Sequence, residues 1–163
     1  MSIMSKIATG TALRDEAIPG QTLSMILYGL KSNKFEQKES RGMLSCLHRI
    51  VMKCEEPFGA QHVGNALYGL QGMSSDNAEV RSLVRALSGH VERCREPLSA
   101  QHVGNALYGL VGVLGVDEGR DLGLQLIRTF LGLLRNCVLV SSDCVYFGQL
   151  IVMALKIILP RRK

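Results

Sequence analysis

The chain has 163 residues, of which 47% are hydrophobic and 20% are charged, a composition atypical of disordered or membrane-embedded chains. Tryptophan is absent and aromatic residues make up 5%, so the core is expected to consist of aliphatic side chains. The net charge of +5 is spread along the chain rather than focused, and therefore favours nucleic-acid binding only weakly.

Two features predict an intracellular, reducing location. Residues 1–19 form a poorly defined leader in which Lys6, Arg14 and Asp15 interrupt any hydrophobic run, so no secretory signal is expected. The chain also has an odd number of cysteines and no C-x-x-C pair: Cys46, Cys54, Cys94, Cys137 and Cys144. We expect these to be buried thiols rather than disulfides.

From residue 20 onward the chain repeats itself. Residues 60–70 and 100–110 both read AQHVGNALYGL, and residues 21–30 (QTLSMILYGL) are a drifted version one interval earlier. The interval is about 40 residues, a period typical of solenoids. The sequence therefore predicts an all-α solenoid of helix pairs, with repeats over 20–57, 58–97 and 98–140, then a partial repeat and basic tail over 141–163. Gly64, Gly69 and their copies lower helix propensity, which suggests that helices approach closely there, although recent duplication would also preserve them.

Each repeat is predicted to contain two helices with one apolar face apiece. In the first repeat the second helix carries apolar residues at helical spacing: Met43, Leu44, Leu47, Val51 and Cys54. In the second repeat both helices do so: Val63, Ala66, Leu67 and Leu70, then Val80, Leu83, Val84, Leu87, Val91 and Cys94. A turn is expected at Gly72 and residues 74–77, and Pro57 and Pro97 follow the ends of the second helices.

The third repeat is predicted to follow the same plan. Ser99 is expected to cap its first helix, and its second helix is expected over about residues 119–137. A final helix is predicted over about residues 143–159. The apolar run at 148–159 is too short to cross a bilayer, so no membrane partner is expected.

A polar stripe lies opposite the apolar face of each first helix. At 100° per residue, three side chains of the second repeat share one side, and their copies do the same: Gln61, Asn65 and Tyr68, then Gln101, Asn105 and Tyr108, with Gln21 and Tyr28 in the first repeat. A carboxamide offers a donor and an acceptor to a base edge, and a tyrosine ring can carry a stacked base. Alternatively, these side chains are buried between neighbouring repeats, with the Asn hydrogen-bonded to backbone.

The second helices provide candidate phosphate contacts, namely Arg41, Arg81 and Arg85. The alternative is a solvated polar face. His62 and His102 recur at equivalent places of successive repeats, too far apart in stacked repeats to share a zinc ion, and we expect them to be partly exposed at a helix edge. No nucleotide-binding, serine-hydrolase or zinc-peptidase motif is present, so we expect no cofactor and no enzymatic activity.

Residues 99–110 (SAQHVGNALYGL) resemble the pattern S-x-Q-x-[LIV]-[SA]-N-x-[LA]-[WY]-[AG]-[LF] of helical-pair repeats in organellar RNA metabolism. Such proteins include RAP-domain and FAST-kinase-like proteins, octotricopeptide and heptatricopeptide repeat proteins, and repeat subunits of the kinetoplastid RNA-editing substrate-binding complex. The resemblance covers roughly residues 20–137. It implies RNA binding and a mitochondrial or plastid location, and it places Gln61, Asn65, Tyr68 and their copies at motif positions. This sequence departs from the families in having Tyr where they usually have Trp and in lacking a recognisable RAP-type module.

Three hypotheses follow. In the first, the chain is a non-catalytic protein that binds single-stranded RNA in organellar RNA processing or editing, with the stripe on bases and the arginines on phosphates. In the second, it is a protein–protein interaction solenoid that binds a peptide or a partner subunit. In the third, it is a segment of a longer array or a recently duplicated reading frame. Phosphate binding should weaken steeply with salt, whereas an apolar peptide groove should not.

Overall fold

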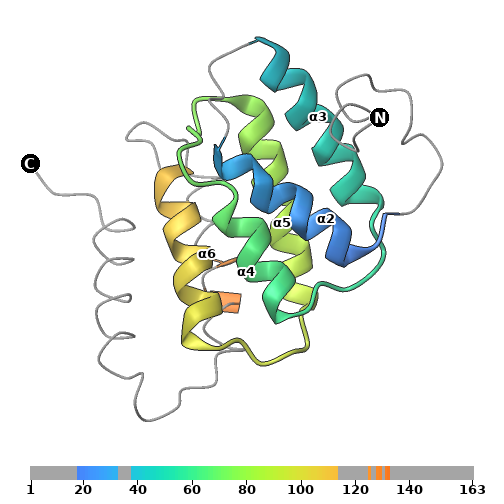
Figure 1. The fold of residues 1–163 in the computed structure, drawn as a ribbon, viewed down its shortest axis with the longest axis vertical. Helices are drawn as coiled ribbons and strands as arrows, with labels where there is room; N and C mark the ends of the chain where they lie inside the picture. The colour runs from blue at the N-terminus through green and yellow to red at the C-terminus, as the bar shows by residue number, and fades with distance from the viewer. Residues whose placement is uncertain (1–17, 33–37, 114–124, 126–127, 130, 133–163) are drawn as a thin grey trace, which may run out of the picture.

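The computed structural model describes residues 18–32, 38–113, 125, 128–129 and 131–132 (Figure 1). The elements in this part are all helical: α2 (Gly20–Gly29), a short 3-10 helix η1 (Leu30–Ser32), α3 (Lys38–Lys53), α4 (Ala60–Tyr68), α5 (Ala78–Arg93) and α6 (Ala100–Val113). The all-α prediction is thus confirmed for the described residues. Most of the second helix predicted for the third repeat and all of the final helix lie outside them.

The helices form two layers. In the first, which we call the A layer, α4 packs between α2 and α6, and the three helices lie side by side (Figure 1). In the second, the B layer, α3 packs against α5. Each layer therefore brings together helices that are not consecutive in the chain, because consecutive helices alternate between the layers.

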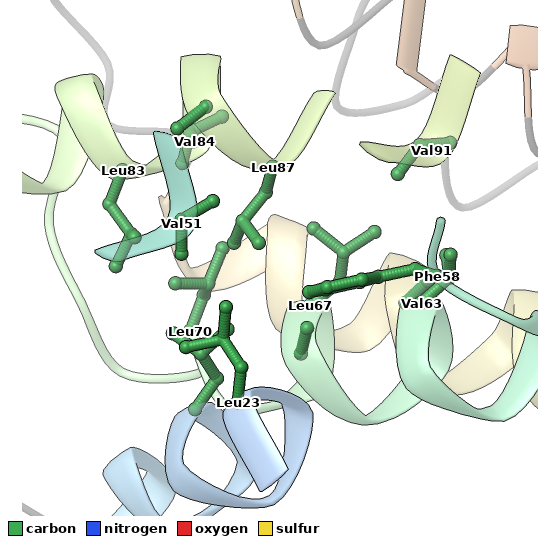
Figure 2. Close-up of a cluster of buried hydrophobic side chains, with 14 of the residues drawn as sticks. Leu23, Val51, Phe58, Val63, Leu67, Leu70, Leu83, Val84, Leu87 and Val91 are labelled. Carbon is green, nitrogen blue, oxygen red and sulfur yellow. The ribbon is translucent and has the colours of Figure 1, made fainter. Parts of the chain in front are cut away.

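The core lies between the two layers. Figure 2 shows Leu23 of α2 and Leu67 of α4 facing Val51 of α3 and Leu87 of α5. The apolar faces predicted for the second repeat are the buried ones, with no side chain more than 3% exposed: Val63, Ala66, Leu67 and Leu70 of α4 and its end, and Val80, Leu83, Val84, Leu87, Val91 and Cys94 of α5 and its end. Each large aliphatic side chain buried in this way contributes about 1.5–3 kcal/mol of transfer free energy.

Two glycines let the backbones of the A helices touch. A Cβ atom built on Gly69 would lie 2.0 Å from the carbonyl oxygen of Leu27 in α2. A Cβ atom on Gly109 of α6 would lie 1.8 Å from the carbonyl oxygen of Leu67 in α4. Gly69 has an ordinary helical φ of −61°, so the position requires glycine because of space rather than because of its dihedral angles.

The N-terminus of α6 is capped at the residue that the sequence predicted. The backbone N–H of His102 donates to Ser99 Oγ, and the N–H of Ser99 donates to His102 Nδ1, both at 3.3 Å. The predicted N-cap is therefore confirmed as half of a reciprocal capping box. The turn predicted after α4 is also present, with Gly72 at φ +76°, in the left-handed region that favours glycine.

Glutamates reach back to cap the A helices from the loops that follow the B helices. The N–H of Gly20 donates to Glu56 Oε2, and the N–H of Ala60 donates to Glu96 Oε2 at 2.7 Å. A carboxylate at a helix N-terminus satisfies a free N–H and interacts favourably with the helix dipole. Each contact thus ties the start of an A helix to the loop that closes the same helix pair.

The cysteines within the described residues behave as predicted. Cys46, Cys54 and Cys94 are buried and form no disulfide, and burial raises the pKa of the Cys54 and Cys94 thiols above its ordinary value. A buried thiol of this kind acts as a small apolar side chain. Cys137 and Cys144 lie outside the described residues. No helix in the described part of the chain is both long and apolar enough to cross a membrane.

Candidate functional site

The polar stripe of α4 points out of the A layer. Two glycines mark the lateral sides of this helix: Gly69 faces α2, and a Cβ atom on Gly64 would lie 3.4 Å from the Cα atom of His102 in α6. At 100° per residue, Gln61, Asn65 and Tyr68 fall between these two sides and opposite the buried face. Gln61 is exposed, while Asn65 and Tyr68 are half-buried. The stripe is therefore on the outer surface of the layer.

The carboxamides of this surface are not committed to contacts within the described part of the chain. Gln21, Gln61 and Gln101 are exposed, and Asn105 is half-buried like Asn65. None of the five side chains makes a hydrogen bond to a described residue. Asn65 thus makes no hydrogen bond to the described backbone of the next repeat, while the repeat that follows Asn105 lies outside the described residues.

The outer face of the A layer carries almost no charge. The sequences of α2, α4 and α6 contain no Asp, Glu, Lys or Arg. At the position equivalent to Asn65, α2 has Met25, whose side chain is 63% exposed. The Lys31 ammonium, in η1, lies beside this face. The face is thus a neutral, hydrogen-bonding surface rather than a basic one.

The three tyrosines of the stripe form a continuous column across the A layer. The ring centroids of Tyr28 and Tyr68 are 5.6 Å apart and those of Tyr68 and Tyr108 are 5.7 Å apart, with interplanar angles of 21° and 25°. Lys31 Nζ donates to the Tyr28 hydroxyl at 2.6 Å and lies 3.8 Å from the Tyr28 ring centroid. Each stacked pair is worth about 0.5–1.5 kcal/mol, and the cation adds a similar amount.

The column limits how Tyr68 can contact a ligand. Its two ring faces are stacked against Tyr28 and Tyr108, so a base would have to separate the rings in order to stack on it. The edges of the rings face the same surface as the carboxamides. Tyr108 is 54% exposed, because its neighbour Tyr68 covers only one side of its ring. The column itself was not predicted, since it depends on how closely the A helices pack.

The three candidate phosphate contacts lie on the other layer. Arg41 of α3 and Arg85 of α5 are exposed. Arg81 is half-buried, and its Nη1 donates to the backbone carbonyl of Ser75, which anchors the loop that precedes α5. The structure thus brings the Gln, Asn and Tyr side chains together on the A layer but does not bring the arginines to that face.

A shallow pocket between α3 and α5 was not predicted from the sequence. Its volume is about 320 Å³, and it is lined by Ser45, His48 and Arg49 of α3 and by Ala78, Glu79 and Ser82 of α5. The pocket exists only because two helices that are not consecutive in the chain lie together in the B layer. Nothing in the local sequence of either helix marks it. Its wall carries His48 and Arg49 as well as the carboxylate of Glu79. The charge of the wall therefore does not indicate whether an anion or a cation would bind there.

The recurrent histidines have a structural role. His62 Nδ1 accepts the N–H of Gly59 and His102 Nδ1 accepts the N–H of Ser99, each at 3.3 Å. Both side chains are half-buried at the start of an A helix, as predicted. Among the residues that the structure describes, no group of three or more His, Cys, Asp or Glu side chains could hold a metal ion.

Comparisons of the chain with protein-family models, with curated proteins and with solved structures gave no match.

Proposed function

We propose that the chain is an α-solenoid of helix pairs with a period of about 40 residues, and that it binds single-stranded RNA, without catalysis, across the outer face of the A layer. The period is supported by contacts that recur at this spacing, such as those of Gly69 and Gly109 with the preceding A helix. A layer built in this way presents the same side chains at regular intervals. Such a surface suits an extended ligand with a repeating unit, as in repeat proteins that read RNA base by base.

The observation that carries the proposal is the row of uncommitted carboxamides. Gln61, Asn65 and their copies offer donors and acceptors to solvent from the outer face of a rigid layer. Single-stranded RNA exposes the hydrogen-bonding edges of its bases, and a carboxamide can donate to and accept from one edge together. Half-burial of Asn65 and Asn105 restricts their rotamers before binding, which lowers the entropy lost on contact.

The geometry favours edge contacts over stacking. Because the faces of Tyr68 are stacked on its neighbours, bases would meet the carboxamides and the tyrosine edges. The phosphates would point toward solvent, since α2, α4 and α6 carry no Lys or Arg and Lys31 offers a single ammonium beside this face. Each neutralised phosphate contributes about −0.7 to the slope of log K against log salt for single strands. With the single cation Lys31 engaged, binding at the A layer alone should therefore show a slope of about −0.7, whereas recruitment of the B-layer arginines should make it steeper.

The test is fluorescence anisotropy with a mixed-sequence single-stranded RNA in a salt series. The double variant Asn65→Ala, Asn105→Ala should weaken binding by about 5- to 150-fold, because two hydrogen bonds of about 0.5–1.5 kcal/mol each are lost. The double variant Arg41→Ala, Arg85→Ala is the control on the B layer and should bind like the wild type. Unchanged affinity in the Asn variant, together with a loss in the Arg variant, would place RNA on the B layer and refute the proposed face.

The neutrality of the A layer favours one second candidate, a scaffold that binds an extended peptide. Regularly spaced carboxamides can pair with a peptide main chain as well as with bases, and exposed Met25 adds an apolar contact. The same titration separates the two candidates. A chain that is helical by circular dichroism but does not bind RNA even at low salt would favour the peptide scaffold.

A further inference from the structure

The three A helices follow one register. Ring centroids of neighbouring tyrosines in the column are 5.6 and 5.7 Å apart. Ideal Cβ atoms on Gly69 and Gly109 would lie 2.0 and 1.8 Å from a carbonyl oxygen of the preceding A helix. Helix α2 is therefore placed against α4 as α4 is placed against α6. The residues three positions before each tyrosine, which are Met25, Asn65 and Asn105, form one row across the layer.

Met25 is the member of this row that differs. Its side chain is 63% exposed, so it reaches the outer surface as the carboxamides do. A carboxamide carries donors and an acceptor, whereas a thioether is a weak acceptor with no donor. The polarizable sulfur instead makes favourable contacts with aromatic rings, and every base presents such a ring face. Contact at Met25 therefore does not depend on which base is present.

The other polar groups near α2 do not restore this recognition. Gln21 is exposed, whereas Asn65 is half-buried, so the glutamine loses more side-chain freedom on contact and discriminates less. The Lys31 ammonium donates to the Tyr28 hydroxyl at 2.6 Å. An ammonium suits a phosphate, which is common to all nucleotides and carries no sequence information. Helix α2 and η1 thus offer contacts that hold a nucleotide without identifying its base.

We propose that base recognition on the A layer is divided among its helices, and that Met25 sets the division. Asn65 of α4 and Asn105 of α6 discriminate between bases, while Met25 of α2 holds a nucleotide whatever its base. The inference rests on the proposed binding of single-stranded RNA to this face. A base that leaves a carboxamide without a partner should bind about 5- to 150-fold more weakly. No such difference should exist at the nucleotide that contacts α2.

The test is selection of bound RNA from a single-stranded pool with a randomised segment, followed by sequencing. Met25→Asn supplies the missing carboxamide and should add one preferred position at one end of the selected sequence. Asn65→Met should abolish the preference at the position next to it. Each change exchanges residues that the chain already carries at equivalent places, so the fold should be kept, which circular dichroism checks. Met52→Asn is the matched control, because Met52 is 65% exposed on α3 of the B layer, and it should select the same sequence as the wild type.

The outcomes separate this inference from the proposed function. If Asn65→Met removes a preferred position but Met25→Asn adds none, the division of roles is wrong and the RNA-binding face stands. If Met52→Asn adds a position as Met25→Asn does, the gain does not come from the A layer and the inference is again overturned. A pool that the wild type does not enrich, or a selected sequence unchanged by both Asn65→Met and Asn105→Met, would refute the proposed function itself.

Discussion

The sequence Leu-Tyr-Gly-Leu occurs at residues 27–30, 67–70 and 107–110. Replacing its glycine by alanine should destabilise the fold at Gly69 and Gly109 but not at Gly29, where no atom lies within 4 Å of the ideal Cβ position. At Gly69 the new Cβ atom would lie 2.0 Å from the Leu27 carbonyl oxygen, and at Gly109 it would lie 1.8 Å from that of Leu67. Ordinary contact begins near 3.4 Å, so the backbones would have to separate substantially. The obstacle is the main chain of a packed helix, which cannot rotate away as a side chain can.

The size of the effect follows from two opposing terms. Overpacking of this kind costs about 1–3 kcal/mol and occasionally more, while replacing a helical glycine by alanine gains up to about 1 kcal/mol. The obstacle is backbone at 2.0 and 1.8 Å, so the cost should lie toward its upper end, and Gly69→Ala and Gly109→Ala should lose about 1–2 kcal/mol of the free energy of unfolding net of the helix gain. Gly29→Ala has only the favourable term, reduced because the residue ends α2, and should be neutral or slightly stabilising.

The measurement is urea unfolding followed by circular dichroism. The free energies of unfolding of the three variants are compared with a common m-value, the slope of the unfolding free energy against urea concentration. A small domain has a total stability of about 5–15 kcal/mol, so the expected losses are easily resolved. Gly69→Ala and Gly109→Ala variants as stable as Gly29→Ala would refute the backbone contact between neighbouring A helices. The proposed binding face would then lose its structural basis, since its stacked tyrosines and aligned carboxamides require these helices to be closely spaced.

Two further predictions concern single side chains. His90 is 1% exposed, and its Nε2 lies 3.0 Å from the Val51 carbonyl oxygen; burial holds its pKa below the ordinary value of 6.5. As pH falls through about 6.5 the unfolded chain therefore takes up a proton before the folded chain does, so stability should be full above this pH and decline below it. In thermal unfolding at a series of pH values, the melting temperature of His90→Gln should fall less below pH 6.5 than that of the wild type. Equal dependence of the two melting temperatures on pH would contradict this role of His90. Glu96→Ala should cost about 1 kcal/mol by uncapping α4, while Glu92→Ala, exposed on α5, should change stability by only a few tenths; equal melting temperatures would show that the cap contributes nothing.

The buried faces could be predicted from the sequence because burial follows helical period. Val80, Leu83 and Val84 are spaced at intervals that only one side of a helix can satisfy, and they are buried. The close approach at Gly69 was also visible, because glycine inside a helix needs a compensating reason. These signals are local: each is carried within one turn or two of a single helix.

Contacts that join distant segments could not be predicted in the same way. The tyrosine column depends on the distance between A helices, which Gly69 and Gly109 set from outside the stripe. The caps by Glu56 and Glu96 join segments far apart in the chain, although the Glu-Pro pair before each AQHVGNALYGL copy was a usable signal. The separation of the stripe from Arg41 and Arg85 required knowing that the two helices of a pair lie in different layers.

The close glycine contact links the packing of the A layer to the kind of ligand that its surface can select. It brings the helices near enough for the rings of Tyr28, Tyr68 and Tyr108 to stack, with centroids of neighbouring rings 5.6 and 5.7 Å apart. The stacked ring faces are therefore not available to a ligand. What remains outward is a row of carboxamides and ring edges on helices without a charged residue. Such a surface discriminates by hydrogen-bond pattern, because a missed donor or acceptor costs about 1–3 kcal/mol while long-range attraction contributes little. A ligand of this face should therefore bind with strong dependence on Asn65 and Asn105 and weak dependence on salt, the reverse of what an arginine-driven phosphate site would show.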